Sequence, residues 1–267
     1  MARGSTQAYD LLVSYWFSVA RRTYQSLRMI VQERQNLYKW ALLFLGAWSL
    51  SPASQSSGNK LMSVSRANLC VTEGVIEELP GDRLSVSVPK MRAYVNAFTP
   101  QVVEARFTYI GPTGNEARLG SGALRRQFGL KLRAQDACNL VYAMWRIEPE
   151  SKLVVSVKSN PGQHTSAECG NNGYRNIKPR HSIPVPGLRS GRTHTLRAEM
   201  NGAEMLVFVD NSLVWEGSVG PDALAFDGPV GIRSDNLRLQ IELRAGQPLQ
   251  AQSGHGPGCL SSGEESE

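Results

Sequence analysis

Apolar and polar side chains alternate residue by residue along much of the chain beyond residue 84. The alternation is clearest over residues 84–88, 103–109, 128–132 and 237–243, where every second side chain is apolar. A period of two places successive side chains on opposite faces of an extended strand, so that one face is buried and the other solvated. The pattern therefore predicts a series of half-buried β-strands.

Turn residues separate these segments at short intervals. Asn201-Gly202 lies between two alternating runs, which is a strong hairpin signal, and residues 111–115 and 210–212 supply further turns. Consecutive hairpins argue against the helical crossovers that parallel sheets require. We therefore predict an all-β fold, an antiparallel β-sandwich of about ten strands that occupies residues 70–245.

Two segments depart from simple alternation. Residues 140–145 are apolar on both faces, and such a strand is expected in the middle of a sheet because both of its faces need cover. Residues 160–192 are rich in Gly, Pro and Asn and form the longest irregular stretch of the domain. We expect a loop there with room for one short strand, and long loops in compact domains often carry function.

The last part of the domain carries an ordered set of motifs. A strand over residues 193–196 leads into a hairpin over residues 206–215, and residues 228–236 then read GPVGIRSDN. This order resembles the end of concanavalin A-like and laminin-G-like jelly-roll domains, and it is similar to the 3-keto-disaccharide hydrolase domain family. The resemblance implies a concanavalin-like jelly roll, whereas the motif is structural and says little about function. Asn211-Ser212 stands where many members have Asn-Gly, which leaves the type of that turn open.

The most apolar window of the chain is WALLFLGAWSL, at residues 40–50, with basic residues upstream and Ser51-Pro52-Ala53 after it. Its length of about 11 residues suits the apolar region of a signal peptide, whereas a membrane-spanning helix needs about 20. We predict an N-terminal extension with a helical signal peptide or anchor over residues 1–53, with cleavage after Ala53, and a linker over residues 54–69. The protein is then expected outside the cytoplasm, as a secreted, periplasmic or envelope-associated protein.

The segment before this window is long for a signal peptide, and two explanations stay open. Translation could begin at Met29, which would give a signal peptide of ordinary length. Alternatively, apolar residues at helical spacing over residues 8–31 would form an amphipathic helix of a membrane-tethered form. A buried core helix is a third interpretation of the apolar window itself.

The four cysteines are far apart in the sequence and form no Cys-x-x-Cys pair, and the four histidines are not at zinc-ligand spacing beside them. In an exported protein the remaining use of cysteine is a disulfide, and we predict one between Cys138 and Cys169. If the protein were cytosolic, these residues would instead be small buried side chains. The pairing of Cys70 and Cys259 stays open, and Cys259 falls in a tail over residues 246–267 that is expected to be disordered.

A net charge of +6 and a pI near 9.3 are compatible with an anionic partner or with simple solubility. The basic residues are scattered, with no long run and no interleaved aromatics of the kind that nucleic-acid-binding motifs carry. We therefore expect no nucleic acid partner. A membrane contact is expected only through the N-terminal segment if that segment is not cleaved.

Motifs for catalysis are not evident. Glu148 and Glu150 have the spacing of a strand face, but Pro149 separates them, so a solvated turn is the simpler interpretation. Asp235 and Asn236 could bind calcium, although their place in the sequence suits a turn better. We expect no cofactor and no metal site, and catalysis is left uncertain, with glycoside hydrolysis as the reaction if there is one.

Residues of the types that bind sugars flank the predicted disulfide. Carbohydrate recognition needs an aromatic surface for the apolar face of the sugar and planar polar groups for its hydroxyls. The candidate ligand-binding residues are Trp145, Arg146, Asn171, Asn172, Tyr174 and Arg175. We therefore predict a non-catalytic extracytoplasmic recognition module for carbohydrate or another envelope polymer. The alternatives are a hydrolase of the keto-disaccharide-hydrolase type and a structural adhesion domain.

Overall fold

The computed structural model describes residues 60–96 and 101–246. The chain divides into the units Met1–Gly58 and Asn59–Glu267, and all described residues belong to the second. The predicted export signal and the tail beyond residue 246 lie outside the described residues. Within the described ranges, no helix is both long enough and apolar enough to cross a membrane.

Sixteen strands form within the described ranges: β1 Leu61–Val64, β2 Leu69–Glu73, β3 Glu77–Leu79, β4 Arg83–Val86, β5 Lys90–Val95, β6 Val102–Pro112, β7 Arg126–Leu132, β8 Leu140–Glu148, β9 Lys152–Lys158, β10 Tyr174–Asn176, β11 His181–Ser182, β12 Thr193–Asn201, β13 Glu204–Val209, β14 Ser212–Ser218, β15 Gly231–Asp235 and β16 Leu237–Gly246. The helical elements are single turns: η1 Arg66–Asn68, α2 Ser166–Cys169 and η2 Pro221–Leu224.

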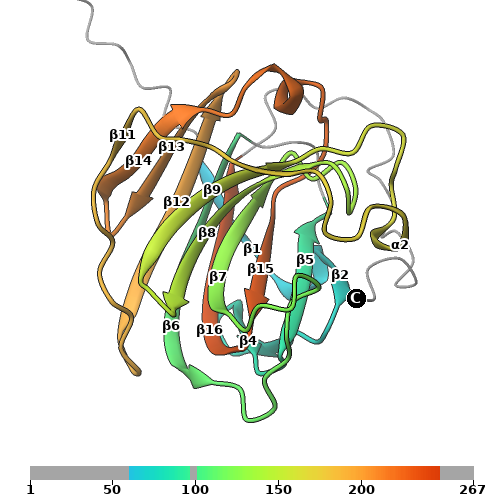
Figure 1. Cartoon of the computed structure of the whole chain (residues 1–267). Helices are drawn as coiled ribbons and strands as arrows, with labels where there is room; N and C mark the ends of the chain where they lie inside the picture. Colours follow the sequence, from blue (N-terminus) through green and yellow to red (C-terminus); the bar gives the residue numbers. More distant parts are fainter. Residues whose placement is uncertain (1–59, 97–100, 247–267) are drawn as a thin grey trace, which may run out of the picture. The chain divides into compact units, whose positions relative to one another are not determined.

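The strands form two antiparallel sheets (Figure 1). A nine-stranded sheet has the order β11-β14-β13-β12-β6-β16-β4-β3, with β1 also paired to β16. A seven-stranded sheet has the order β10-β9-β8-β7-β15-β5-β2. This arrangement confirms the all-β, two-sheet antiparallel sandwich that alternation predicts.

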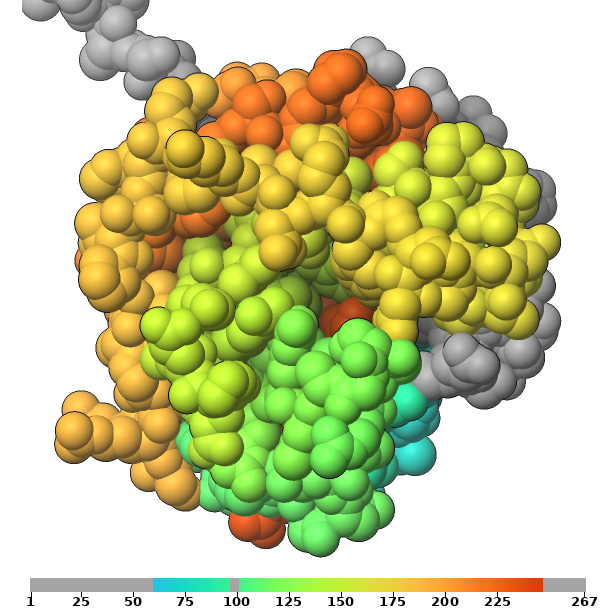
Figure 2. All heavy atoms as spheres, viewed as in Figure 1, coloured from blue at the N-terminus to red at the C-terminus, as the bar shows by residue number. Residues whose placement is uncertain are grey.

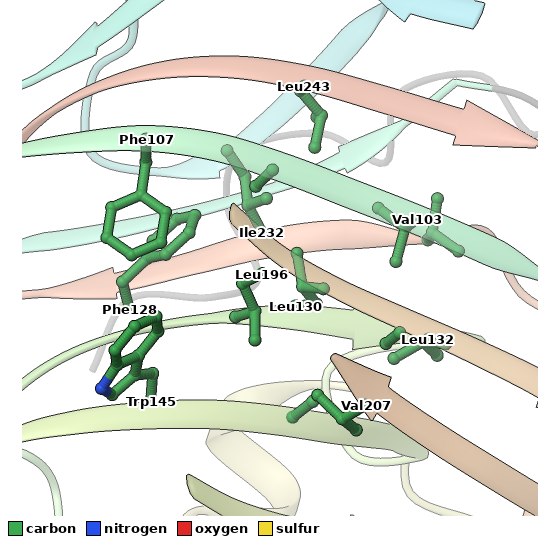
Figure 3. Packing of buried hydrophobic residues seen from close by; sticks show 14 of the residues in the cluster. Val103, Phe107, Phe128, Leu130, Leu132, Trp145, Leu196, Val207, Ile232 and Leu243 are labelled. Atoms are coloured by element: carbon green, nitrogen blue, oxygen red, sulfur yellow. The ribbon is translucent and has the colours of Figure 1, made fainter. Parts of the chain in front are cut away.

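The core lies between the inner faces of the two sheets, as Figure 3 shows. Phe107 of β6 contributes a ring whose centroid lies 4.8 Å from that of Phe128 on β7 and 5.7 Å from that of Trp145 on β8. All three side chains are fully buried. Because burial of one large apolar side chain is worth about 2–3 kcal/mol, this aromatic cluster is a main source of cohesion between the sheets.

The predicted hairpins are present. Asn201 pairs with Glu204, so that Gly202 and Ala203 form a two-residue loop, and Gly202 has a φ of 59°. The next hairpin also has a two-residue loop, in which Asp210 and Asn211 both have positive φ values, 49° and 66°. Positive φ at both central residues is typical of a type I′ turn, and Asn and Asp tolerate it without glycine.

The sandwich begins earlier than predicted. The strand β1 and the turn η1 lie within residues 54–69, which we expected to be a linker, and β1 pairs with the end of β16. Four residues are too short for a clear period of two, and the partner strand lies about 180 residues further along the chain, so the sequence gives no local signal for this pairing. The irregular stretch 160–192 contains α2 and two short strands, β10 and β11.

The strand β8 is central, as its two apolar faces predict. It lies between β7 and β9, and Trp145 and its alternate neighbours face the core. The other face carries Leu140, Tyr142 and Met144, which pack with Ala134 in a second, smaller apolar cluster. This second face of the seven-stranded sheet carries the candidate site.

Candidate functional site

A hollow lies on the outer face of the seven-stranded sheet. Figure 2 shows it between the green segment near residue 120 and the yellow segment near residue 170, with the red-orange of β15 visible at its bottom. The hollow contains a groove of about 260 Å³, which we call the outer groove. Its lining consists of Leu119, Ser121, Arg125, Gln127, Tyr142, Met144, Arg146, Val154, Ser156, Asn171, Tyr174, Asn176 and Arg233.

Two tyrosine rings of the groove lining stack on each other and contact cationic side chains. The rings of Tyr142 and Tyr174 are stacked, with centroids 6.0 Å apart and an interplanar angle of 25°. The guanidinium carbon of Arg233 lies 5.3 Å from the Tyr142 ring centroid, and the ammonium of Lys158 lies 5.2 Å from that of Tyr174. Such cation–π contacts orient flexible cationic side chains. Tyr142 is buried, whereas Tyr174 remains 41% exposed.

The loop over residues 117–125 forms the first wall of the groove. Asn236 fastens both ends of this loop, because its Nδ2 donates to the carbonyl oxygens of Ala117 at 2.8 Å and Arg125 at 2.9 Å. Its Oδ1 accepts a hydrogen bond from the Ala117 amide at 2.8 Å. Asn236 is fully buried and has a φ of 59°, which Asn adopts more readily than most residues.

The loop over residues 159–173 forms the second wall. A disulfide joins Cys138 to Cys169 at the end of α2, with a Cα–Cα distance of 5.9 Å, so the predicted pairing is present. The ammonium of Lys158 donates to the carbonyl oxygens of Ala137 at 3.0 Å and Gly170 at 2.8 Å. Together these bonds fix the loop against the start of β8.

Two further contacts complete the second wall. The Nδ2 atom of Asn160 donates to the carbonyl oxygens of Cys138 at 3.2 Å and Asn172 at 3.1 Å. The side chain of Asn171 then reaches the first wall at Gly120, where an added Cβ would lie 2.7 Å from Asn171 Nδ2. A side chain at position 120 would therefore require the Asn171 amide group to move.

The sequence does not predict how Cys70 and Cys259 are paired. Cys70, on β2, is disulfide-bonded as well. Cys259 lies outside the described residues. Cys138 and Cys169, which lie near the site, are joined to each other, and their disulfide supports the second wall.

A buried ion-pair network lies beneath the groove. The Oδ1 of Asp235 accepts from Arg92 at 2.7 Å, and its Oδ2 accepts from Arg233 Nε at 3.0 Å and from Gln127 Nε2 at 2.6 Å. Burial alone would raise the pKa of Asp235, but the charges of Arg233 and Arg92 outweigh it and lower that pKa to about 2. The carboxylate is therefore ionised and fully engaged.

This network also decides the role of two residues that were considered for calcium. Asp235 is bound by arginine side chains, and Asn236 forms the predicted turn and fastens the first wall. Among the described residues, no group of three or more His, Cys, Asp or Glu side chains is placed to hold a metal ion.

Arg146 differs from these paired arginines. Its Nε atom is buried and has no hydrogen-bond partner. Burial lowers the pKa of Arg146, and the charge of the nearby Arg125 lowers it further. Arg125 and Arg146 both line the outer groove, and its lining contains no carboxylate.

The structure brings together three of the six candidate ligand-binding residues, namely Arg146, Asn171 and Tyr174. The prediction for Trp145 is wrong, because its side chain is 0% exposed and packs between the sheets. Arg175 lies away from the groove, with NH2 3.5 Å from the Asp222 carboxylate. In both cases the cause is the period of two, since neighbouring residues of a strand point to opposite faces.

Asn172 contributes through its backbone, because its carbonyl oxygen accepts the Asn160 bond, and its side chain does not line the groove. The sequence interpretation also missed Tyr142, Arg125, Gln127 and Arg233. Tyr142 could have been found by counting back from Arg146 in steps of two along β8. Arg233 could not, because its place beside β8 depends on the strand order of the whole sheet.

Comparison with known proteins finds structural neighbours at low sequence identity. No protein-family model matches the sequence, and no curated protein matches it. The chain is similar in structure to the carbohydrate binding module CBM66 from Bacillus subtilis, with 15% identity over 65% of this chain and 91% of that chain and a TM-score of 0.46. It is similar to the Emp47p carbohydrate recognition domain, with 12% identity over 73% of this chain and 100% of that chain and a TM-score of 0.46. A galectin of Caenorhabditis elegans matches at 9% identity over 69% of this chain and 99% of that chain, with a TM-score of 0.37.

Proposed function

We propose that this protein is a non-catalytic recognition module that binds carbohydrate in the outer groove. The observation that carries the proposal is the exposed ring of Tyr174, which stands in one groove with guanidinium and amide side chains. Sugars present apolar C–H faces that pack on aromatic rings, and hydroxyls that bond to planar polar groups. The groove offers both kinds of contact side by side.

The rigidity of the groove supports the same proposal. The first wall is fastened by Asn236, and the second by the disulfide and Lys158. A ligand that enters a groove with fixed walls orders few additional groups, and this reduces the entropic cost of binding. Such pre-organisation is valuable for oligosaccharides, which gain little free energy from each hydroxyl contact.

The chemistry of the lining favours binding over hydrolysis. A glycosidase of the usual kind needs two carboxyl groups about 5–10 Å apart across the glycosidic bond. Among the described residues that line the outer groove there is no carboxylate, and the adjoining cavity of about 70 Å³ contributes one, Glu73, which lies near Arg92 and Lys90. If the protein were a hydrolase of the keto-disaccharide-hydrolase type, it would turn over disaccharides. We expect no turnover of disaccharides.

We also propose that the protein acts outside the cytoplasm. The Cys138–Cys169 disulfide supports this location, because disulfides persist in oxidising compartments and are rare in the cytosol. The export signal predicted for residues 1–53 has the same implication. Sequencing the N-terminus of the purified protein tests it: a mature chain that begins near residue 54 is expected, and one that begins before residue 40 would refute export with cleavage.

A glycan array probed with the purified full chain tests the proposed function. We expect binding to a restricted set of glycans, weakened about tenfold or more by Tyr174→Ala, which corresponds to at least about 1.4 kcal/mol. Ile183→Ala is the matched control, since Ile183 is 43% exposed and lies beyond β11 beside the other sheet. Binding that survives Tyr174→Ala unchanged would contradict the site, and a chain that binds no glycan would favour the adhesion alternative.

A further inference from the structure

The outer groove carries positive charge that the described protein does not neutralise. Its charged lining residues are Arg125, Arg146 and Arg233. Arg233 is paired with Asp235, and its pKa is raised well above the ordinary value because the attraction of Asp235 outweighs burial. Arg125 and Arg146 have no carboxylate partner, so they give the groove its net positive charge.

Arg126, the neighbour of Arg125 in the sequence, is bonded to two carboxylates. Arg126 NH1 donates to both carboxylate oxygens of Glu148, at 2.6 and 2.7 Å, and its Nε and NH2 donate to Glu116. Arg126 is therefore held between two carboxylates. Within the described residues, the side chains of Arg125 and Arg146 have neither an ion pair nor a hydrogen bond to an acceptor.

One donor of Arg146 is cut off from solvent. Its Nε atom is buried and makes no hydrogen bond. This arrangement costs stability, because the N–H group has lost its hydrogen bond to water without gaining one within the protein. Two cationic groups side by side add mutual repulsion. Unpaired charged groups destabilise the free protein. Where such groups converge on a groove, they are typical of a binding site in which the ligand supplies the missing partner.

We propose that Arg125 and Arg146 form an oxyanion subsite in the outer groove, and that the ligand is therefore an acidic carbohydrate. The inference rests on the proposed function and specifies its ligand class. A guanidinium group donates two parallel hydrogen bonds to a carboxylate or to a sulfate ester, and both oxyanions fit that geometry. Tyr174 would contact the sugar ring while the two arginines bind its charged substituent.

Paired probes that differ only in charge test this inference. Tetragalacturonate is compared with its methyl ester, and a κ-carrageenan tetrasaccharide, whose only charges are sulfate esters, with its desulfated form, by calorimetry on the full chain. At least one acidic probe is expected to bind tenfold or more tightly than its neutral counterpart, and whichever pair shows the preference identifies carboxylate or sulfate as the oxyanion. The preference is expected to fall as NaCl is raised, because the contact is ionic.

The double variant Arg125→Gln/Arg146→Gln is expected to reduce the affinity for the preferred acidic probe to that of its neutral counterpart. The matched control, Arg106→Gln/Arg244→Gln, removes the same charge from exposed positions on the outer face of the nine-stranded sheet and should leave both affinities unchanged. Thermal unfolding of both variants checks that each is folded.

Other outcomes separate this inference from the proposed function. If acidic and neutral probes bind equally, or if the double variant keeps its preference, the oxyanion subsite is refuted. If neutral glycans bind at least as tightly as acidic ones and Tyr174→Ala weakens them, the proposed function still stands while the acidic ligand class is wrong. If neither these probes nor any arrayed glycan binds, both proposals are refuted.

Discussion

Arg233 donates from Nε to the Oδ2 of Asp235 at 3.0 Å, two residues further along β15, and both side chains lie beneath the outer groove. Asp235 also accepts from Arg92 on the neighbouring strand β5. One buried carboxylate thus fixes Arg233, which lines the outer groove, and Arg92, which lines the adjoining cavity. The position of Arg233 over Tyr142, and with it the stacked tyrosine pair, depends on this network.

Removing the charge of Asp235 should therefore be costly. Asp235→Asn leaves the buried Arg233 without its counter-charge and leaves Arg92 with Glu73 alone, at 3.6 Å, and we expect a loss of about 3–5 kcal/mol in the free energy of unfolding. Urea unfolding at pH 7 measures it. Asp222→Asn is the control, because the Asp222–Arg175 pair is exposed and should contribute less than about 1 kcal/mol. Equal losses in the two variants would contradict the role of Asp235.

The same residue predicts a pH dependence. The folded-state pKa of Asp235, about 2, lies below its ordinary value of 3.8, so the carboxylate stabilises the fold fully above about pH 5. That contribution is lost as the pH falls toward the folded-state pKa. The difference in unfolding free energy between the natural protein and Asp235→Asn should thus shrink by about 2 kcal/mol between about pH 5 and pH 2. A difference that stays constant with pH would mean that the network does not hold an ionised Asp235.

Replacing Arg146 should affect stability in the opposite way to replacing Asp235. Because its Nε is buried without a partner, Arg146→Gln is expected to leave the free energy of unfolding unchanged within about 0.5 kcal/mol, or to raise it. Arg126→Gln on the same sheet should instead cost about 1–3 kcal/mol, since Arg126 is bonded to two carboxylates. Chemical denaturation of both variants makes the comparison. A large loss for Arg146→Gln would show that the arginine is structural.

Asn236 offers a test of the first wall. Asn236→Gly keeps the positive φ without strain but removes the three side-chain hydrogen bonds to Ala117 and Arg125, while Asn236→Ala adds backbone strain. We expect losses of about 2–4 kcal/mol for Gly and about 1 kcal/mol more for Ala. Hydrogen exchange at the amides of Leu119 and Gly122 should become faster in both. Unchanged exchange would show that the loop keeps its structure without Asn236.

The disulfide should matter for both stability and the second wall. Cys138→Ala/Cys169→Ala opens a loop with a sequence separation of 31 residues, and the chain-entropy model predicts a loss of about 3–4 kcal/mol. Lys158 and Asn160 still hold the loop, so we expect the variant to fold. Calorimetry measures the loss, and glycan affinity should fall as the wall loosens. A variant with natural affinity would show that the disulfide serves stability alone.

Much of the fold was predictable because apolar and polar residues alternate along a half-buried strand. The alternation around Phe107 and Phe128 predicts strands, and Asn201-Gly202 predicts a hairpin; both are confirmed. The short strands β1 and β3 were missed, and residues 160–192 contain two short strands, β10 and β11, where one was expected, because two to four residues are too few to show a period. Their pairing comes from distant partners, which local patterns do not encode.

The candidate site was only partly predictable, for a related reason. Residue types near Cys138–Cys169 pointed to the edge of the domain where the outer groove lies, and Arg146 and Tyr174 line that groove. Trp145 was assigned to the site because an aromatic beside Arg146 suits sugar binding, yet adjacent strand residues face opposite ways. Arg233 and Asn236 reach the groove through the order of β15 in the sheet, which emerges only from the complete topology.

The most direct test of the account is where a sugar binds. The glycan with the strongest array signal is titrated into the isotope-labelled full chain, and changes in amide chemical shift are mapped on the fold. We predict that the perturbed residues cluster on the outer face of the seven-stranded sheet, over residues 119–125, 142–146 and 171–176 together with Arg233. Perturbations confined to the outer face of the nine-stranded sheet, or to the edge near His194, would contradict the outer groove as the binding site.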